Sequence, residues 1–249
     1  LGLGALTSFG PLALGLYLPA LPELADDLDA SEAAGQATLS ACMVGLALGQ
    51  LVAGPLSDRV GRRRPLLAGV ALFAATSLLC ALAPGIWTLV LVRLAQGLAG
   101  GAGIVIARAI VRDLHAGDEA ARMFSLLMIV SGAAPVLAPV LGSQLLHVTG
   151  WRGIFAVLGA FGVALVGAAV AIPETLPAAR RHAGGLASTL GGLRRVARDP
   201  VGVALAAVLA FGLAGMFTYI SLGAFVLQEG YGLSPQAYGI VFAVNGIGI

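Results

Sequence analysis

The 249-residue sequence is 59% hydrophobic and 10% charged, with a formal net charge of +2. Soluble domains average about 45–50% apolar and about 25% charged residues. This composition and a mean hydropathy of +0.97 therefore exclude an ordinary soluble domain and predict an all-α polytopic membrane protein. The positive charge does not indicate a nucleic-acid partner, because the basic residues lie mostly in loops on one side, where they set membrane topology.

The first membrane helix is expected at 3–22, since about 20 apolar residues cross the hydrocarbon core of a bilayer. Pro19 and Pro22 should break or bend this helix as it leaves the membrane. The loop at 23–35 contains acidic residues but no basic residue, which predicts an outer location. The second helix, at 36–56, carries small residues at four-residue spacing, which favour close packing against another helix.

The charged segment at 57–65 is predicted to be a tight cytoplasmic loop, because arginines are retained on that side of the membrane. Gly54 and Gly61 permit backbone conformations that are closed to other residues, and Pro65 suits the first turn of the next helix. That helix, at 66–84, consists mainly of Leu, Ala and Val. It is expected to face lipid and to have no chemical function.

The fourth helix, at 87–107, holds Arg93 and Gln96 on one face of an otherwise apolar segment. A charge within a membrane span is costly and marks a candidate functional residue. The alternative is that the Arg93 side chain extends to the outer interface, with only its stem in the membrane. The following loop, at 108–121, contains several arginines and is predicted to be cytoplasmic.

The fifth helix, at 122–146, contains Pro135 and Pro139, which remove successive backbone hydrogen bonds. Such weakening is tolerated where neighbouring helices or water satisfy the freed carbonyl groups, so this helix should bend and face other helices or a cavity. The sixth helix is expected to begin at GWRGIF (150–155) and to end at PETLP (173–177).

Residues 178–199 are basic and place leucines on one helical face, which predicts an amphipathic linker on the inner membrane surface. A calmodulin-type target would have a similar pattern. A seventh helix is expected at 200–227 and the start of an eighth at 236–249, so that the chain is expected to be a fragment. All 14 basic residues are arginine, which hints at a bacterial source, and all but Arg93 and Arg152 lie in or beside the segments predicted to be cytoplasmic.

Cysteines and histidines show no pattern that indicates a reactive site. Cys42 and Cys80 lie inside apolar spans without the spacing of a disulfide or a metal motif, so we expect small apolar core residues, no metal and no cofactor. His115, His147 and His182 lie in loops or at helix ends without a partner at catalytic spacing. The sequence therefore does not predict an enzyme.

The segment GPLSDRVGRRRP resembles the loop signature between helices two and three of the major facilitator superfamily. The matching residues are Gly54, Asp58, Arg59, Gly61, Arg62 and Arg63. Together with LPALP, LVRLAQG, RAIVRD, APVLAPVLG, GWRGIF and PETLP, residues 13–177 are similar to the Bcr/CflA type of drug:proton antiporter in this superfamily. The resemblance implies twelve helices in two six-helix bundles around a cavity that opens alternately to each side. Residues 1–177 would then form the first bundle, 178–199 a linker, and 200–249 the seventh and part of the eighth helix.

The same resemblance implies roles for individual residues. Asp58 resembles an acid that pairs with an arginine at the inner end of helix four and stabilises the outward-open state; Arg112, or Arg108 one turn earlier, would be that arginine. The alternative is an ion pair that stabilises only the loop. Arg93 resembles a fourth-helix arginine that is proposed to handle protons or substrate. The antiporter signature of helix five falls on Pro135, Ala138, Pro139 and Gly142, with Ala138 where Gly is usual.

Residues expected to line the cavity or to couple transport are Tyr17, Gln50, Arg93, Gln96 and Tyr219. Gly15 stands where this family usually carries an acid in its first helix, and no other acid of the sequence lies deep in a span. Proton coupling needs a group that binds and releases protons, for which a buried carboxyl is suited. The proton carrier is therefore expected beyond Ile249, or transport is not coupled to protons.

The expected function is that of a monomeric secondary transporter in the lipid bilayer, which exports small amphipathic drug-like molecules in exchange for protons. The alternatives are a proton-independent facilitator, a transporter of sugars or other metabolites from the same superfamily, and a degenerate, non-transporting fragment that serves as a sensor or scaffold.

Overall fold

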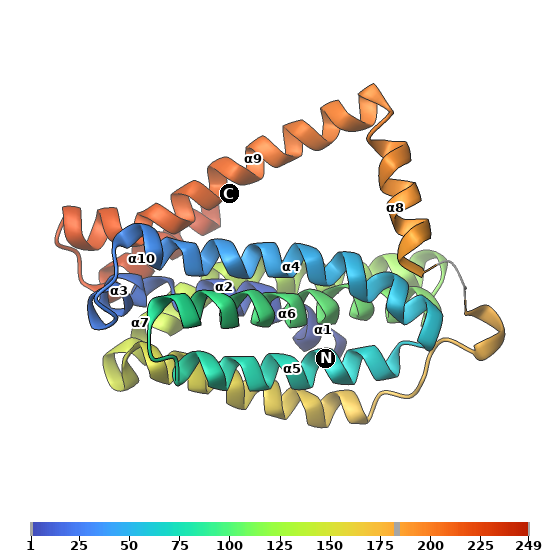
Figure 1. The fold of residues 1–249 in the computed structure, drawn as a ribbon, viewed down its shortest axis with the longest axis horizontal. Coiled ribbons are helices and arrows are strands. Elements are labelled where there is room, and N and C mark those ends of the chain that lie inside the picture. Colours follow the sequence, from blue (N-terminus) through green and yellow to red (C-terminus); the bar gives the residue numbers. More distant parts are fainter. Residues whose placement is uncertain (1, 182–184, 249) are drawn as a thin grey trace.

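The computed structural model describes residues 2–181 and 185–248 (Figure 1). Within these ranges the chain forms α-helices with three short 3-10 or π turns and no strand. The elements are α1 (Gly2–Thr7), α2 (Phe9–Gly15), η1 (Leu18–Ala20), α3 (Leu21–Asp27), α4 (Glu32–Val60), α5 (Arg63–Ala81), α6 (Ile86–Leu114), α7 (Gly117–Val170), η2 (Ala178–Arg180), α8 (Gly185–Val196), α9 (Pro200–Phe225), η3 (Val226–Gly230) and α10 (Pro235–Gly248). Five helical segments, namely α4, α5, α6, α7 and α9 with η3, are long and apolar enough to cross a membrane.

The first span is not one helix that breaks at Pro19 and Pro22, as the sequence predicted, but a series of short helices that begin to separate much earlier. α1 ends at Thr7 and α2 ends at Gly15. These ends lie four residues before Pro11 and Pro19, because a proline has no N–H to donate to the carbonyl of residue i−4. The chain then continues as η1 and α3 to Asp27, beyond the predicted end.

The predicted loop at 57–65 is largely helical, so the sequence prediction was wrong in its extent. α4 continues through Pro55 to Val60, and α5 begins at Arg63. The turn is therefore reduced to Gly61 and Arg62. Gly61 has a φ of +99°, a conformation that favours glycine.

α4 and α6 pack closely, as the small residues of the second helix predicted. A Cβ atom on Gly45 or Gly49 would overlap the backbone carbonyl oxygen of Leu94 or Leu98. In the opposite direction, a Cβ atom on Gly97 would overlap the carbonyl oxygen of Cys42. Small residues on both helices thus allow the two backbones to touch.

α5 does not simply face lipid, which corrects the expectation for the third helix. It lies between α6 and α7, and Val70, Phe73 and Ser77 are fully buried there. α6 also extends beyond the predicted span to Leu114, so Arg108 and Arg112 belong to its last turns rather than to a loop.

α7 contains both the predicted fifth and the predicted sixth helix, and the chain changes direction between them at Gly150. This residue has φ +66° and ψ 179°, outside the helical region. The GWRGIF segment therefore begins the second half of α7, as predicted, and this half ends at Val170, before PETLP. In the first half, a Cβ atom on Gly142 would overlap the carbonyl oxygen of Leu16, so that α7 contacts the end of α2 directly.

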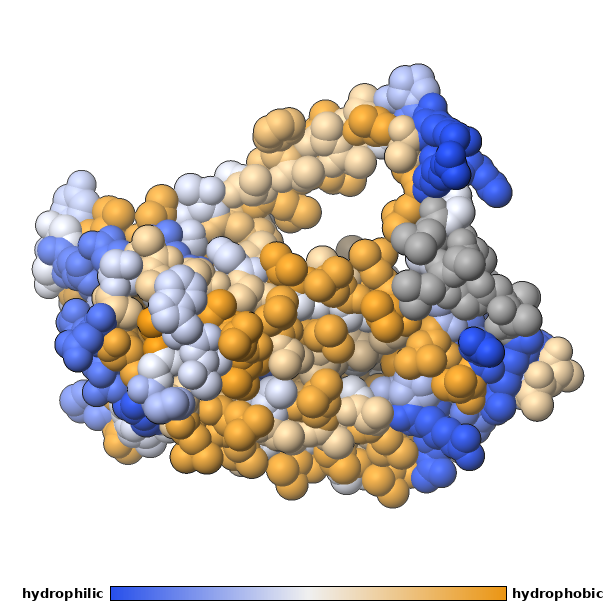
Figure 2. All heavy atoms as spheres, in the orientation of Figure 1, coloured by the Kyte–Doolittle hydropathy of each residue, from blue (hydrophilic) through white to orange (hydrophobic). Residues whose placement is uncertain are grey.

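The linker helix α8 (Gly185–Val196) contacts α4 and leads away from the bundle to α9 (Figure 1). α8 forms a helix within 178–199, the range that the sequence predicted to be a linker, of which 182–184 lie outside the described residues. α9 diverges from α4 toward α8, whereas η3 and α10 pack against the bundle at the other end (Figure 1). Figure 2 shows that the space between α8, α9 and α4 is open, and that hydrophobic side chains cover most of the visible face between the two ends, where hydrophilic ones gather.

Candidate functional site

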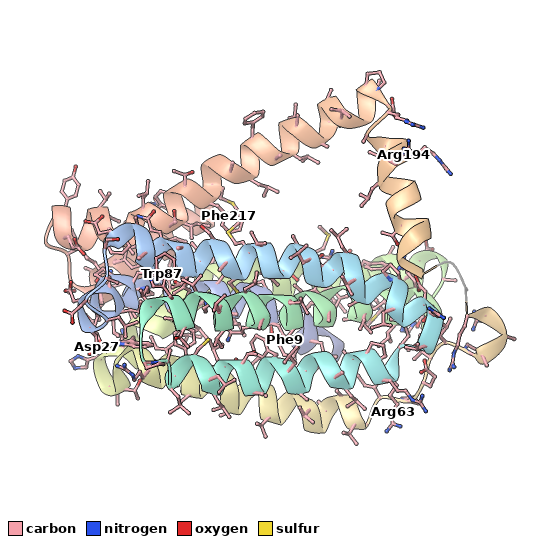
Figure 3. All side chains as sticks on the ribbon, in the orientation of Figure 1. Phe9, Asp27, Arg63, Trp87, Arg194 and Phe217 are labelled. Carbon is pink, nitrogen blue, oxygen red and sulfur yellow. The ribbon has the colours of Figure 1, made fainter. Side chains whose placement is uncertain are left out.

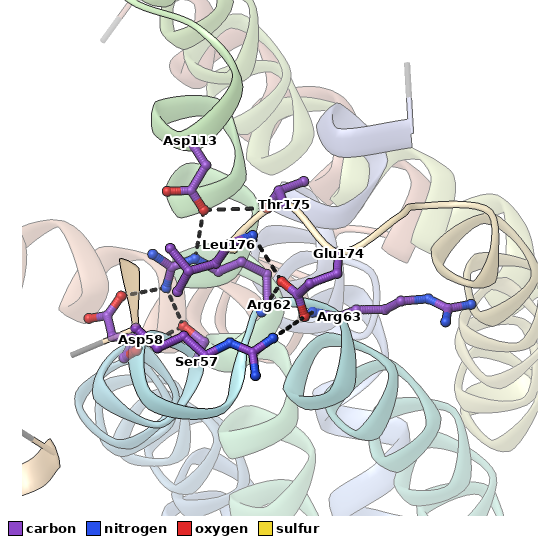
Figure 4. A network of polar contacts seen from close by, with 10 residues as sticks. Ser57, Asp58, Arg62, Arg63, Asp113, Glu174, Thr175 and Leu176 are labelled. Atoms are coloured by element: carbon purple, nitrogen blue, oxygen red, sulfur yellow. Dashed lines mark hydrogen bonds and ion pairs between the residues drawn. The ribbon is translucent and has the colours of Figure 1, made fainter. Parts of the chain in front are cut away.

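Arg62, in the turn between α4 and α5, is the centre of an ion network at the arginine-rich end of the bundle (Figure 4). Its Nη1 donates to the Asp58 carboxylate at 2.5 Å and to Ser57 Oγ at 2.7 Å. Its Nε donates to Asp113 Oδ2, at the end of α6, at 2.9 Å. Burial lowers the pKa of the Arg62 guanidinium, but the hydrogen bonds and charges of Asp113 and Asp58 together outweigh burial and raise it above its ordinary value. Arg62 therefore connects α4 and α6 as a permanent cation between two acids.

Glu174, in the PETLP segment after α7, holds the same turn from the other side. Its carboxylate accepts hydrogen bonds from the backbone N–H groups of Arg62 at 2.8 Å and Arg63 at 3.3 Å. Burial raises the pKa of this carboxyl, but hydrogen bonds from the N–H groups of Leu176, Arg62 and Arg63 and the charge of Arg181 outweigh burial and bring the pKa below its ordinary value. The carboxylate lies so close to Gly61 that a Cβ atom there would collide with it.

These contacts correct the predicted partner of Asp58. Arg62 occupies that position, whereas Arg108 and Arg112 are exposed on α6 and form no ion pair with Asp58 in the described residues. Arg59 is also exposed, and Arg63 donates from Nη2 to the carbonyl oxygen of Val170 at 3.1 Å.

Neither Asp113 nor Glu174 was predicted from the sequence to be a site residue. Asp113 follows directly after Arg112 in RAIVRD, and Glu174 is the acid of PETLP. Their position in the two motifs was the available signal. Their partners were not evident, because the distance along the chain says nothing about which helix ends meet.

Arg93 lies fully inside the bundle, so the alternative that its side chain reaches the outer interface is wrong. Its Nη1 donates to Gln96 Oε1 at 2.5 Å, and Gln96 Nε2 donates to Ser77 Oγ at 2.7 Å. The guanidinium carbon lies 4.2 Å from the ring centre of Tyr17 and 5.5 Å from that of Phe155. Cation–π attraction is strengthened when the charge is removed from water. Arg93 Nε and Nη2 have no hydrogen-bond acceptor among the described residues.

A cavity of about 170 Å³ lies where α2, α4 and α7 meet α9 and α10. Its lining is apolar apart from Gln50; the other residues are Gly10, Pro11, Leu14, Gly15, Leu18, Leu46, Ile104, Pro135, Met216, Phe217, Ile220 and Phe242. An apolar cavity with few polar groups suits loose selection of hydrophobic molecules.

Of the predicted cavity residues, Gln50 lines this cavity. Tyr17 instead packs against Arg93 and forms a hydrogen bond of 3.2 Å with Thr38, and Gln96 is bound to Arg93 and Ser77. Tyr219 lines a separate groove between α9 and α10, where its hydroxyl accepts a hydrogen bond from Asn245 at 2.6 Å.

The helix-five residues that resemble the antiporter signature contribute to the cavity wall and to packing. Pro135 lines the cavity, and Gly142 contacts the backbone of Leu16. Ala138 lies against Gly15, since a Cβ atom on Gly15 would be only 2.6 Å from the Ala138 Cβ atom. The two departures from the family pattern, at 15 and 138, are therefore neighbours in space.

A second set of polar contacts connects α3 to the turn at Gly150, at the opposite end of the molecule from Arg63 (Figure 3). Asp27 accepts hydrogen bonds from Trp151 Nε1 at 3.0 Å and from Arg152 Nη1. The hydrogen bonds from Arg152 and Trp151 lower the pKa of the Asp27 carboxyl. Glu23 Oε1 accepts from the Trp151 N–H at 3.2 Å.

The profile of the Major Facilitator Superfamily matches residues 3–249. The chain is 44% identical over 99% of its length to "Uncharacterized MFS-type transporter YdgK" of Bacillus subtilis, of which it covers 62%. It is 32% identical over 98% of its length to the "Bicyclomycin resistance protein homolog" of Haemophilus influenzae, of which it covers 62%. It is 38% identical over 70% of its length to the "Multidrug resistance protein MdtL" of Escherichia coli O157:H7, of which it covers 45%. The chain thus spans less than two thirds of each relative.

The fold is similar to solved transporter structures. A bacterial homologue of the human lysosomal transporter Spinster, in an inward-facing and unoccupied conformation, has a TM-score of 0.78 at 18% identity, over 99% of this chain and 59% of that chain. The D-xylose-proton symporter has a TM-score of 0.63 at 17% identity, over 99% of this chain and 64% of that chain. At these identities the likeness shows the fold alone.

Proposed function

Because the chain belongs to the Major Facilitator Superfamily, as a multi-pass membrane protein similar to drug transporters of the Bcr/CflA type, we propose that the full-length protein exports small amphipathic drug-like molecules across the bacterial inner membrane. The observation that carries this proposal is the apolar cavity with Gln50 as its polar lining residue. This cavity lies between the first bundle (1–177) and the segment after the linker (200–249). A molecule bound there could be exposed first to one side of the membrane and then to the other.

The arrangement of the helices supports alternating access. η3 and α10 contact the bundle at the Asp27 end, and α9 diverges from α4 at the arginine-rich end (Figures 1 and 3). If the arginine-rich segments 57–65 and 178–199 face the cytoplasm, as their arginines indicate, this arrangement corresponds to a state closed to the outside and open to the inside. The Arg62 network would stabilise the inner end of the first bundle differently in the two states.

Protons are the proposed coupling ion, carried by an acid outside this sequence. In the described parts of the membrane-spanning helices, the charged residue that is buried is Arg93, and no acid is buried there. An arginine does not release its proton at ordinary pH, so Arg93 cannot carry the proton by itself. A proton-independent facilitator, a metabolite transporter and a non-transporting scaffold remain the alternatives.

The test is drug export by the purified full-length protein in proteoliposomes, with and without a pH gradient. We expect a hydrophobic dye to move only when the protein is present, and faster with a gradient. Gln50→Leu should change the range of exported dyes, and Gln144→Leu, an exposed glutamine on α7, is the matched control. Movement of metabolites but of no dye would contradict the proposal, and movement of dye without a response to pH would favour the facilitator.

A further inference from the structure

Gln50, on α4, carries the polar side chain of the cavity wall among the residues that the structure describes. Its amide folds back along the helix, and Nε2 donates to the carbonyl oxygen of Leu46, one turn earlier, at 3.3 Å. A carbonyl oxygen can only accept a hydrogen bond, so this contact fixes which end of the amide is the nitrogen. Oε1 is then the other end, and no donor in the described part of the chain binds it.

The remaining hydrogen-bonding capacity of Gln50 favours acceptance. An amide oxygen has two lone pairs, and an amide nitrogen has two N–H groups. The carbonyl group of Leu46 takes one of these N–H groups, whereas both lone pairs of Oε1 remain. Gln50 therefore offers a bound molecule two acceptor positions and one donor position.

Two prolines add further acceptors to the same wall. Gly15 and Pro135 both line the cavity. Pro19 has no N–H group for the carbonyl oxygen of Gly15, and Pro139 has none for that of Pro135, because each proline stands four residues later in the chain. The described wall is therefore richer in acceptors than in donors.

The apolar character of the rest of the wall makes an unpaired acceptor costly. A bound molecule removes Oε1 from water, and a molecule without a donor leaves this oxygen unpaired. A molecule with an N–H or O–H group replaces the bond to water instead. A site that forms a hydrogen bond with one group of a substrate thereby selects against analogues that lack the group.

We propose that the cavity selects apolar molecules that carry an N–H or O–H donor, and that Gln50 Oε1 is the acceptor that binds this group. The inference rests on the proposed function, and it narrows the substrates from amphipathic molecules in general to hydrogen-bond donors. It makes Gln50 a residue that determines specificity.

The test is equilibrium dialysis of two isomers, 3-methylindole and 1-methylindole, against the full-length protein in lipid nanodiscs. The isomers have the same composition and the same ring system, but the first has an N–H group and the second has a methyl group on that nitrogen. Empty nanodiscs measure the partition of each isomer into lipid, which is subtracted. We expect 3-methylindole to bind about three- to tenfold more tightly, as one net hydrogen bond provides.

Two variants remove the acceptor from the cavity. Gln50→Leu and Gln50→Met each replace the amide by an apolar side chain of similar size, and each should bind the two isomers equally. With both variants, the comparison survives if one of them does not fold. Gln144→Leu is the matched control and should keep the preference, because this exposed glutamine of α7 does not line the cavity.

Three results would overturn the inference: equal binding of the isomers by the wild type, no binding of either isomer beyond that of lipid, or a preference that persists without the Gln50 amide. Export of the same isomers from proteoliposomes separates this inference from the proposed function. Preferential binding of 3-methylindole without export of any dye or isomer would leave the inference standing and contradict the proposed function. Export without a preference for the donor would do the reverse.

Discussion

Arg62 shows how one residue of a sequence motif acquires its meaning from its partners. The motif contains several arginines, but Arg62 is the buried one, and it lies between Asp58 on its own side of the turn and Asp113 on another helix. The two ion pairs differ in solvent exposure. The Asp113 side chain is 14% exposed and that of Asp58 is 48% exposed.

We predict that Asp113→Asn destabilises the full-length protein more than Asp58→Asn. Removing one partner of a buried ion pair costs about 3–5 kcal/mol, whereas exposed pairs contribute about 0–1 kcal/mol. Partial exposure places the Asp113 effect toward the lower end of its range. Thermal unfolding of the purified variants measures the order, and equal losses would show that the shared Arg62, rather than burial, determines the cost.

Gly15 and Ala138 are predicted to behave as a pair. Gly15→Ala alone would overfill the contact with Ala138, and overpacking costs about 1–3 kcal/mol. The double variant Gly15→Ala/Ala138→Gly should recover most of this stability, because it removes the methyl group that occupies the space. Melting temperatures of the single and double variants give the coupling, and additive losses would contradict a direct contact.

Arg93 is predicted to be needed for transport rather than for folding. No acid in the described residues pairs with it, so Arg93→Met, which keeps an apolar stem of similar length, should fold at wild-type levels or better. Export by this variant should be lost, and Arg93→Lys should recover it only in part, because the planar guanidinium stacks on Tyr17. Wild-type export by Arg93→Met would give the residue a structural role only.

At the scale of elements, α1 and α2 are short for one reason, and α4 and α6 are long and closely packed for another. The short helices follow from Pro11 and Pro19, which remove the hydrogen bonds to Thr7 and Gly15. α4 and α6 run alongside each other without interruption because small residues on both allow backbone contact. The proline effect depends on neighbouring residues and could have been predicted from the sequence. Which helix packs on α4 depends on contacts between segments far apart in the chain.

The contact between α4 and α6 predicts a difference between two glycines of α4. Gly45→Ala should lower stability by about 1–3 kcal/mol, because its new methyl group would meet the Leu94 backbone, which cannot rotate away. Gly54→Ala is the control, since its Cβ atom would lie 3.7 Å from a Val105 methyl group, and alanine favours a helix. Unfolding in detergent compares the two, and equal stability would exclude close packing at Gly45.

At the scale of the whole molecule, charge divides the two ends. Asp27 lies at one end and Arg63 and Arg194 at the other (Figure 3). We predict that a membrane-impermeant thiol reagent labels Ala33→Cys only from outside the cell and Ala179→Cys only after the cytoplasmic face is exposed, since arginine-rich loops stay inside. The reverse pattern would invert the orientation, and with it the assignment of the state as closed to the outside.

The sequence by itself determined the membrane class, the order of the spans, the superfamily and the division of charge between the ends. These depend on the transfer free energy of each segment and on short motifs, which are properties of neighbouring residues. The tertiary structure alone decided that Arg62, not Arg112, holds Asp58, that Arg93 lies against aromatic rings, and that Gln50 rather than Tyr17 meets the cavity. Each of these depends on how helices distant in sequence rotate and pack against one another, and helical periodicity says which residues share a face but not what that face meets.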